Sequence, residues 1–144
     1  MKNIITLTAD IADVLERVYA ESAWRAAHNP QKPYVLTPDN ARMLTLHARR
    51  GWDDLLARMA GYVSSSNFNP NIDHSLTLNL RVSTDHTDTL AEALTSAMVA
   101  TLSFYILAQV YADDPLSWFD TAWRRHRAQC LLLLARSEHS DYQP

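Results

Sequence analysis

Histidine is the residue type in this 144-residue chain with the widest chemical range, because neutral imidazole binds metal ions and transfers protons near pH 7. The six histidines are His28, His47, His74, His86, His126 and His139. No two of them have the HxxxH or HExxH spacing that places two ligands on one helical face. Asp73-His74 and Asp85-His86 flank one predicted strand, but polar loop residues without a ligand are the simpler interpretation. We predict no metal site and no cofactor.

His126 and Cys130 lie on one apolar stripe near the end of the chain. For His126 we favour a core histidine held by one hydrogen bond, and a metal ligand or general base is the alternative. Cys130 is the only cysteine and cannot form an internal disulfide. Its apolar neighbours predict a buried, unreactive thiol, and a lone thiol is typical of a reducing compartment.

Acid–base and nucleophilic catalysis also lack a sequence signature. Asp53-Asp54 and Asp113-Asp114 are adjacent pairs, and adjacent helical side chains point apart rather than into one site. The serine run at 64–66 has no Gly-x-Ser-x-Gly elbow, and two glycines are too few for a phosphate-binding loop. We predict that the protein has no catalytic residues and is not an enzyme.

Positive charge is concentrated in two short arginine runs, although the formal net charge is −3. The candidate nucleic-acid contacts are Arg49, Arg50, Arg124, Arg125 and Arg127. A solvated helix face is the preferred interpretation, because no helix-turn-helix spacing or aromatic–glycine RNA motif accompanies them. A nucleic-acid-associated or regulatory module that uses this arginine-rich face is the alternative function.

The elements must be organised around residues 93–112, which form about six helical turns without a charged residue. Such a helix is shielded either by lipid or by protein, and its length would just span a bilayer. Interrupting Thr, Ser and Gln residues, flanking Glu92 and Asp113, and the lack of a nearby Lys or Arg cluster favour protein. We predict the central helix of a cytoplasmic protein with no membrane association.

Periodicity predicts the remaining elements. Two-residue alternation predicts strands at 3–8 and 75–82, and three- to four-residue spacing predicts helices at 11–27 and from Thr37-Pro38 to about 63. Residues 64–74 are predicted as a loop. The last helix starts at Asp114-Pro115 and has an apolar seam of Leu116, Phe119, Trp123, His126, Cys130 and Leu133.

These elements predict one mainly α domain over residues 1–144. We expect a four-helix antiparallel bundle with a small two-strand β appendage. The strand at 75–82 needs a partner for its backbone groups. Either the strand at 3–8 or a strand from another subunit would satisfy that requirement.

The last helix carries a second line of large side chains roughly opposite its seam. Its members are Trp118, Arg125, Leu132 and Arg136. Residues 131–134 are apolar almost all around, so this helix is expected to bury a second face. Because Trp and Arg are frequent interface anchors, we predict a homo-oligomer or a complex with a protein partner through this line.

The order of elements resembles that of small virion-assembly proteins encoded in prophages. The residues that carry the resemblance are Leu76, Leu78, Leu80, Tyr105, Trp118 and Phe119. The resemblance to neck, connector or tail-completion subunits of tailed phages implies a compact, helical, non-enzymatic protein that works as a ring beside a portal-side partner. It also implies a place in the virion rather than only in the cytoplasm. The predicted function is therefore structural assembly.

Overall fold

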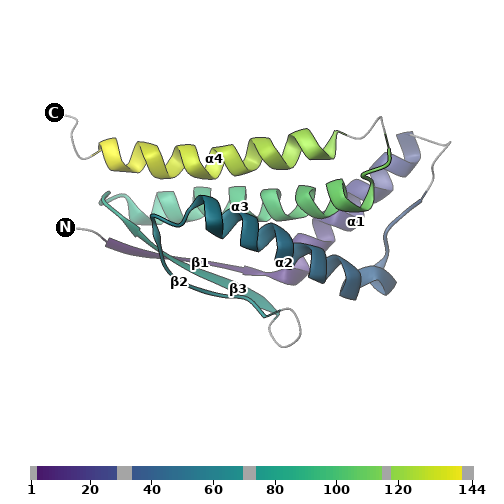
Figure 1. Cartoon of the computed structure of the whole chain (residues 1–144), viewed down its shortest axis with the longest axis horizontal. Coiled ribbons are helices and arrows are strands. Elements are labelled where there is room, and N and C mark those ends of the chain that lie inside the picture. The colour runs from purple at the N-terminus through teal and green to yellow at the C-terminus, as the bar shows by residue number, and fades with distance from the viewer. Residues whose placement is uncertain (1–2, 29–33, 70–73, 115–117, 141–144) are drawn as a thin grey trace.

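The protein is described by a computed structural model that covers residues 3–28, 34–69, 74–114 and 118–140. Eight elements follow one another along the chain (Figure 1). They are β1 Asn3–Asp10, α1 Ile11–His28, the 3-10 turn η1 Pro38–Asn40, α2 Ala41–Arg58, β2 Val63–Asn67, β3 Ser75–Val82, α3 Thr87–Val110 and α4 Phe119–Ser140. The predicted strands at 3–8 and 75–82 and the four predicted helices are all present. The expected helix start at Pro115 and the seam residue Leu116 lie outside the described residues.

The β-sheet has three antiparallel strands in the order β1-β3-β2, so the expectation of a two-strand appendage is wrong. β3 pairs with β1 on one edge, where Leu78 faces Leu7, and with β2 on the other. Both edges of β3 are therefore satisfied within the chain, and no strand from another subunit is required. The side chain of Asn79 links the three strands through hydrogen bonds with Thr6 and Ser65.

β2 occupies part of the segment that was predicted as a loop and as the end of the second helix. α2 ends at Arg58, and Val63 begins a strand instead of completing the helix. Four of the five β2 residues are exposed, so the segment lacks the buried alternation that signals a strand. β2 forms because the free edge of β3 supplies its hydrogen-bond partners. The polar sequence of β2 by itself does not predict this pairing.

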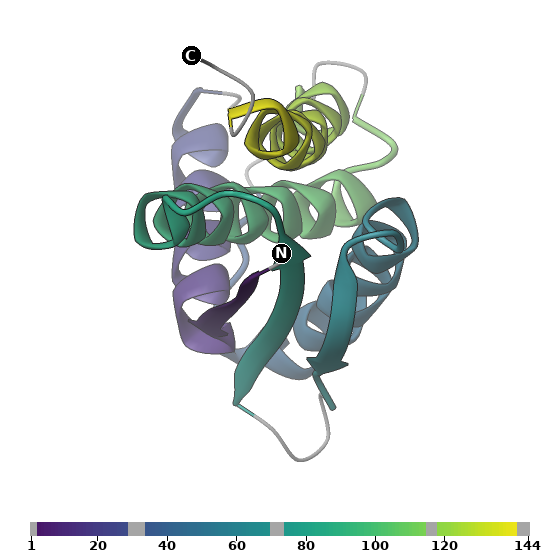
Figure 2. The same ribbon diagram turned by 90° about the vertical axis from the view of Figure 1, so that its left-hand side faces the viewer.

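α3 is the centre of the fold, as its uncharged sequence predicts. It packs against α1, α2, α4 and β1. α3 is long and apolar enough to span a membrane, with a mean hydropathy of 1.6, but 61% of that window is buried inside the protein. In Figures 1 and 2, α3 crosses over the sheet between α1 and α2, and α4 lies on its outer side.

The protein is therefore mainly helical, but its helices are layered on a sheet. α3 and α4 run antiparallel along each other, in agreement with the short connection between them (Figure 1). The buried face of the sheet, with Leu76, Leu78 and Leu80, points into the same apolar core as α3. The expected four-helix bundle is not confirmed, because the three-stranded sheet forms one layer of the fold beside the helices.

Gly51 permits the close approach of α2 and α3. A Cβ at this position would lie 2.9 Å from Cδ1 of Tyr105 and 3.3 Å from Cδ2 of Leu102. Both distances are shorter than ordinary carbon–carbon contacts, so any side chain would push α2 away from α3.

We predict that Gly51→Ala destabilises the protein. Alanine gains about 1 kcal/mol of helix propensity, but overpacking against Tyr105 costs about 1–3 kcal/mol. The measurement is the free energy of unfolding from urea denaturation. Gly61→Ala is the control, because nothing lies within 4 Å of its added Cβ and the change should be neutral or slightly stabilising. A stabilised Gly51→Ala variant would contradict the close packing.

A buried polar network fastens α1 to the end of α3. Nε of Arg25 donates to Oδ2 of Asp114 at 3.0 Å, and the Arg25 guanidinium lies 4.0 Å from the centre of the Tyr111 ring. The Tyr111 hydroxyl donates to the carbonyl oxygen of Tyr34 and also contacts Ser22. Because both charged side chains are more than nine-tenths buried, their mutual attraction offsets part of the cost of removing the two charges from water.

We predict that Arg25→Met or Asp114→Leu alone lowers the free energy of unfolding by about 3–5 kcal/mol, because each removes the ion-pair partner of a buried charge. The double variant should lose much less free energy of unfolding than the sum of the losses in the two single variants. A urea-denaturation double-mutant cycle measures the coupling. Additive losses would show that the ion pair does not fasten these helices.

Candidate interaction surface on α4

The inner face of α4 covers α3. Phe119, Trp123, Cys130 and Leu134 are buried along it, while His126 is only partly buried. Aromatic contacts tie this seam to the central helix: Tyr105 meets Trp123 edge-on at 5.1 Å between ring centres. The predicted seam is confirmed at Phe119, Trp123 and Cys130, whereas at its end Leu134 is buried and the predicted Leu133 only partly so. The opposite face of α4 is left to the surface.

The outer face of α4 carries the four residues that were predicted as an interface. We call this set the α4 outer face; its members are Trp118, Arg125, Leu132 and Arg136. All four are exposed, and Trp118 and Leu132 each retain 44% of their accessible surface. Trp118 precedes α4 but is continuous with it, because its carbonyl accepts from the amide of Ala122. The four side chains therefore lie along one line over about 27 Å of helix.

Phe104 of α3 packs beneath the start of the α4 outer face. Its ring centre lies 5.2 Å from that of Trp118 and 5.4 Å from that of His126, which it stacks on at an interplanar angle of 4°. The guanidinium of Arg17 lies 5.0 Å from the centre of the same ring. Burial first, and then Arg17 and Arg125, lower the pKa of His126 below its ordinary value. His126 is thus a neutral stacking residue at pH 7.

A groove opens between α1 and the start of α4. Its volume is about 390 Å³, and it is lined by Ala20, Glu21, Trp24 and Trp118. The Trp24 side chain is 53% exposed and stacks on His28 with 4.0 Å between ring centres. We call this the Trp24–Trp118 groove. Sequence reasoning missed Trp24 as a site residue, although a tryptophan outside the apolar stripe of its helix was the available signal.

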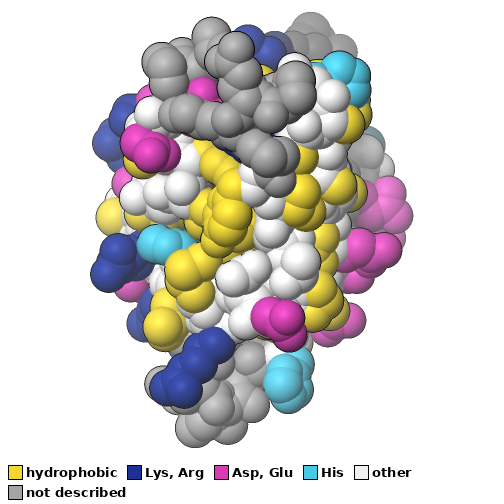
Figure 3. Space-filling model, turned by 90° about the vertical axis from the view of Figure 1, so that its right-hand side faces the viewer, with side chains coloured by type: hydrophobic (Ala, Val, Ile, Leu, Met, Phe, Trp, Pro, Cys, Tyr) yellow, Lys and Arg dark blue, Asp and Glu magenta, His cyan; other side chains and the backbone are white. Residues whose placement is uncertain are grey.

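A second apolar patch was not predicted. It lies on residues 34–46 and is formed by Tyr34, Val35, Met43 and Leu46, all of which are exposed. Hydrophobic side chains gather across the middle of the end of the molecule seen in Figure 3. Met43 and Leu46 lie outside the apolar stripe of α2, which is the same signal that marks Trp24.

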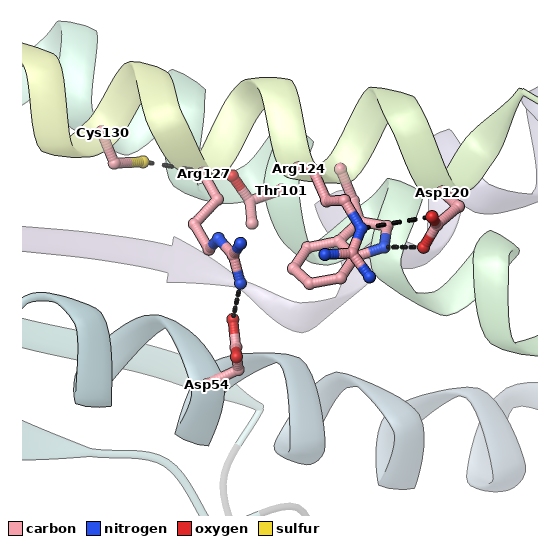
Figure 4. A network of polar contacts seen from close by, with 7 residues as sticks. Asp54, Thr101, Asp120, Arg124, Arg127 and Cys130 are labelled. Carbon is pink, nitrogen blue, oxygen red and sulfur yellow. Dashed lines mark hydrogen bonds and ion pairs between the residues drawn. The ribbon is translucent and has the colours of Figure 1, made fainter.

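Two of the three arginine candidates of α4, Arg124 and Arg127, are engaged within the chain (Figure 4). Nη1 of Arg127 lies 2.9 Å from Oδ2 of Asp54, which joins α4 to α2. Nε of Arg124 lies 3.2 Å from Oδ2 of Asp120. Both guanidiniums also lie over the Trp123 ring, at 5.0 Å for Arg124 and 4.6 Å for Arg127. These two side chains stabilise the fold and are partly neutralised by acids.

On α2, Arg49 forms an ion pair with Asp53 at 3.2 Å and also donates to the carbonyl of Phe68. Arg50 and Arg125 are exposed, with no ion pair among the described residues. Three of the five candidate arginines are therefore neutralised by carboxylates of the same chain. This pattern weakens the attraction to phosphate groups that the sequence alone suggested.

The carboxylate and histidine candidates do not converge on one site. Asp54 pairs with Arg127, and Asp114 is buried against Arg25 while its neighbour Asp113 is exposed. Asp73 lies outside the described residues. Within the described part of the chain, no group of three or more His, Cys, Asp or Glu is arranged to hold a metal ion.

Comparison of this chain with protein-family models, with curated proteins and with solved structures gave no significant match. The functional interpretation therefore depends on the surface geometry.

Cys130 is buried at the interface of α4 with α3. Burial raises the pKa of its thiol from an ordinary value of 9.0 to about 11, and Thr101 Oγ1 lies 4.0 Å from its sulfur. The predicted burial is confirmed. The thiol is protonated at neutral pH and lacks the reactivity of a nucleophile.

We predict that folded Cys130 resists a thiol reagent at pH 8. The raised pKa alone reduces its thiolate fraction about one hundred-fold, and burial slows the reaction further. The control is a Cys130→Ala/Ala128→Cys variant, which moves the thiol to an exposed position on the same helix. Labelling of Cys130 should require urea, while the control reacts in buffer. Equal rates for the two proteins in buffer would contradict the buried assignment.

Proposed function

We propose that the protein is a non-catalytic assembly subunit that self-associates through the α4 outer face. The observation that carries the proposal is the exposure of Trp118 and Leu132 on the helix that covers the core. Exposed large apolar side chains on one surface, next to exposed arginines, are the composition of a protein interface. Association would remove both side chains from water.

The charge on this surface also supports a protein partner over nucleic acid. The α4 outer face has two exposed arginines, Arg125 and Arg136, beside apolar residues rather than a continuous basic stripe. Arg49, Arg124 and Arg127 already pair with carboxylates. The nucleic-acid alternative would require these pairs to break when phosphate binds.

The resemblance to phage neck, connector and tail-completion subunits extends the proposal to virion assembly. Subunits of this kind work as assemblies of several copies, and the α4 outer face would supply one of the contacts between copies. The assembled form would reside in the cytoplasm or in the virion.

We predict that Leu132→Asp and Trp118→Ala weaken self-association. Loss of a buried apolar anchor costs about 2 kcal/mol or more, which corresponds to at least about 30-fold in the dissociation constant. Sedimentation velocity over a concentration series measures the change. Leu46→Asp is the matched control, because Leu46 is an exposed leucine on a different helix, 49% accessible compared with 44% for Leu132.

The control variant should associate like the unmodified protein. A protein that is monomeric at the highest attainable concentration would overturn the proposed function. Dissociation by Leu46→Asp alone would move the interface from α4 to the apolar patch on residues 34–46.

A further inference from the structure

The α4 outer face and the Trp24–Trp118 groove together contain a projecting residue and a place to receive it. Trp118 and Leu132 are fourteen residues apart, which is two heptads and about 21 Å along a helix. Both point outward on the same face. A surface that carries a projection and a groove at a fixed separation is complementary to a second copy of itself under two-fold symmetry.

We propose that two copies pair through antiparallel α4 helices, each inserting Leu132 into the Trp24–Trp118 groove of the other. This inference depends on the proposed self-association and names its partner and its geometry. In this pairing the contact of Leu132 with the two indoles occurs twice, once at each end of the helix pair. A parallel pairing would instead place Trp118 of one copy opposite Trp118 of the other. Neither groove would then receive Leu132.

The groove is suited to an apolar side chain followed by a cation. Its two indole walls, Trp24 and Trp118, are each about half exposed, and Glu21 supplies a carboxylate to its lining. On the incoming helix, Arg136 follows Leu132 by about one turn. Its guanidinium would approach Glu21 of the other copy while Leu132 covers the indoles.

Both charges are available for this contact. Neither Glu21 nor Arg136 forms an intramolecular ion pair among the described residues, in contrast to Arg124 and Arg127 on the same helix. The charge complementarity between the groove and the end of α4 therefore favours a second copy as the occupant.

The same register determines what lies at the centre of the interface. When Trp118 of one copy faces Leu132 of the other, the two-fold axis passes midway between them, at Arg125. The two Arg125 side chains then lie opposite each other, and like charges at an interface oppose association. Arg125 would thus limit the strength of the pair, unlike Arg136.

The test is a charge exchange measured by sedimentation equilibrium. Glu21→Arg and Arg136→Glu should each weaken dimerisation about tenfold or more, because each places like charges together at both ends of the interface. The double variant should recover affinity close to that of the unmodified protein. Arg125→Gln should tighten the dimer. Arg42→Glu is the control: Arg42 is an exposed arginine on α2, and its reversal should leave dimerisation unchanged.

Self-association that persists without recovery in the double variant, or that Arg125→Gln weakens, would overturn the antiparallel pairing and leave the proposed function intact. Absence of self-association in the unmodified protein would overturn both. Circular dichroism melting of each variant separates a lost contact from a lost fold, and recovery by the double variant excludes a general effect of added charge.

Discussion

The shielding of α3 from water is the constraint on which the rest of the structure depends. Its uncharged side chains, such as Leu94, Met98 and Leu102, are buried around most of the helix. A helix without a polar face needs an apolar environment on nearly every side, and 61% of the most apolar window of α3 is buried inside the protein. The sheet, α1 and α2 cover one part of its surface, and α4 covers the other. The buried hydroxyls of Thr101 and Ser103 donate to carbonyls one turn earlier in α3, and the Ser103 hydroxyl also lies 3.3 Å from the carbonyl oxygen of Val14 on α1.

The need to shield α3 explains where α4 lies, but it does not explain all of the side chains that α4 carries. Covering α3 requires one apolar face, which Phe119, Trp123 and Cys130 provide. Trp118 packs on Phe104 of α3 with one side of its ring, but Trp118 and Leu132 each leave 44% of their surface exposed. Their presence is the physical reason for proposing a second partner for α4. The groove that Trp24 forms with Trp118 makes this partner surface more specific than an apolar stripe alone.

The arginines divide into two groups with different roles. Arg25 and Arg127 pair with carboxylates on distant elements and hold α1 and α4 against the rest of the fold. Arg125 and Arg136 project from the α4 outer face and have no ion pair among the described residues. Of the clustered arginines, Arg127 and Arg49 contact other elements of the fold, and Arg124 pairs within α4. With a net charge of −3, the protein has no general electrostatic attraction to phosphate.

The sequence by itself determined the four helices, two of the three strands, the central place of α3 and the burial of Cys130, because each depends on local periodicity or on a long uncharged run. It also identified the outward line of α4, whose role as an interface stays a prediction. Only the tertiary structure decided that Ser-rich β2 joins the sheet, that Arg127 pairs with Asp54, and that Trp24 meets Trp118 across a groove. The last two contacts join segments far apart in the chain, whereas β2 pairs with the next strand, β3, without an alternating sequence. Periodicity carries no information about which other segment satisfies a strand edge, a charge or an exposed ring.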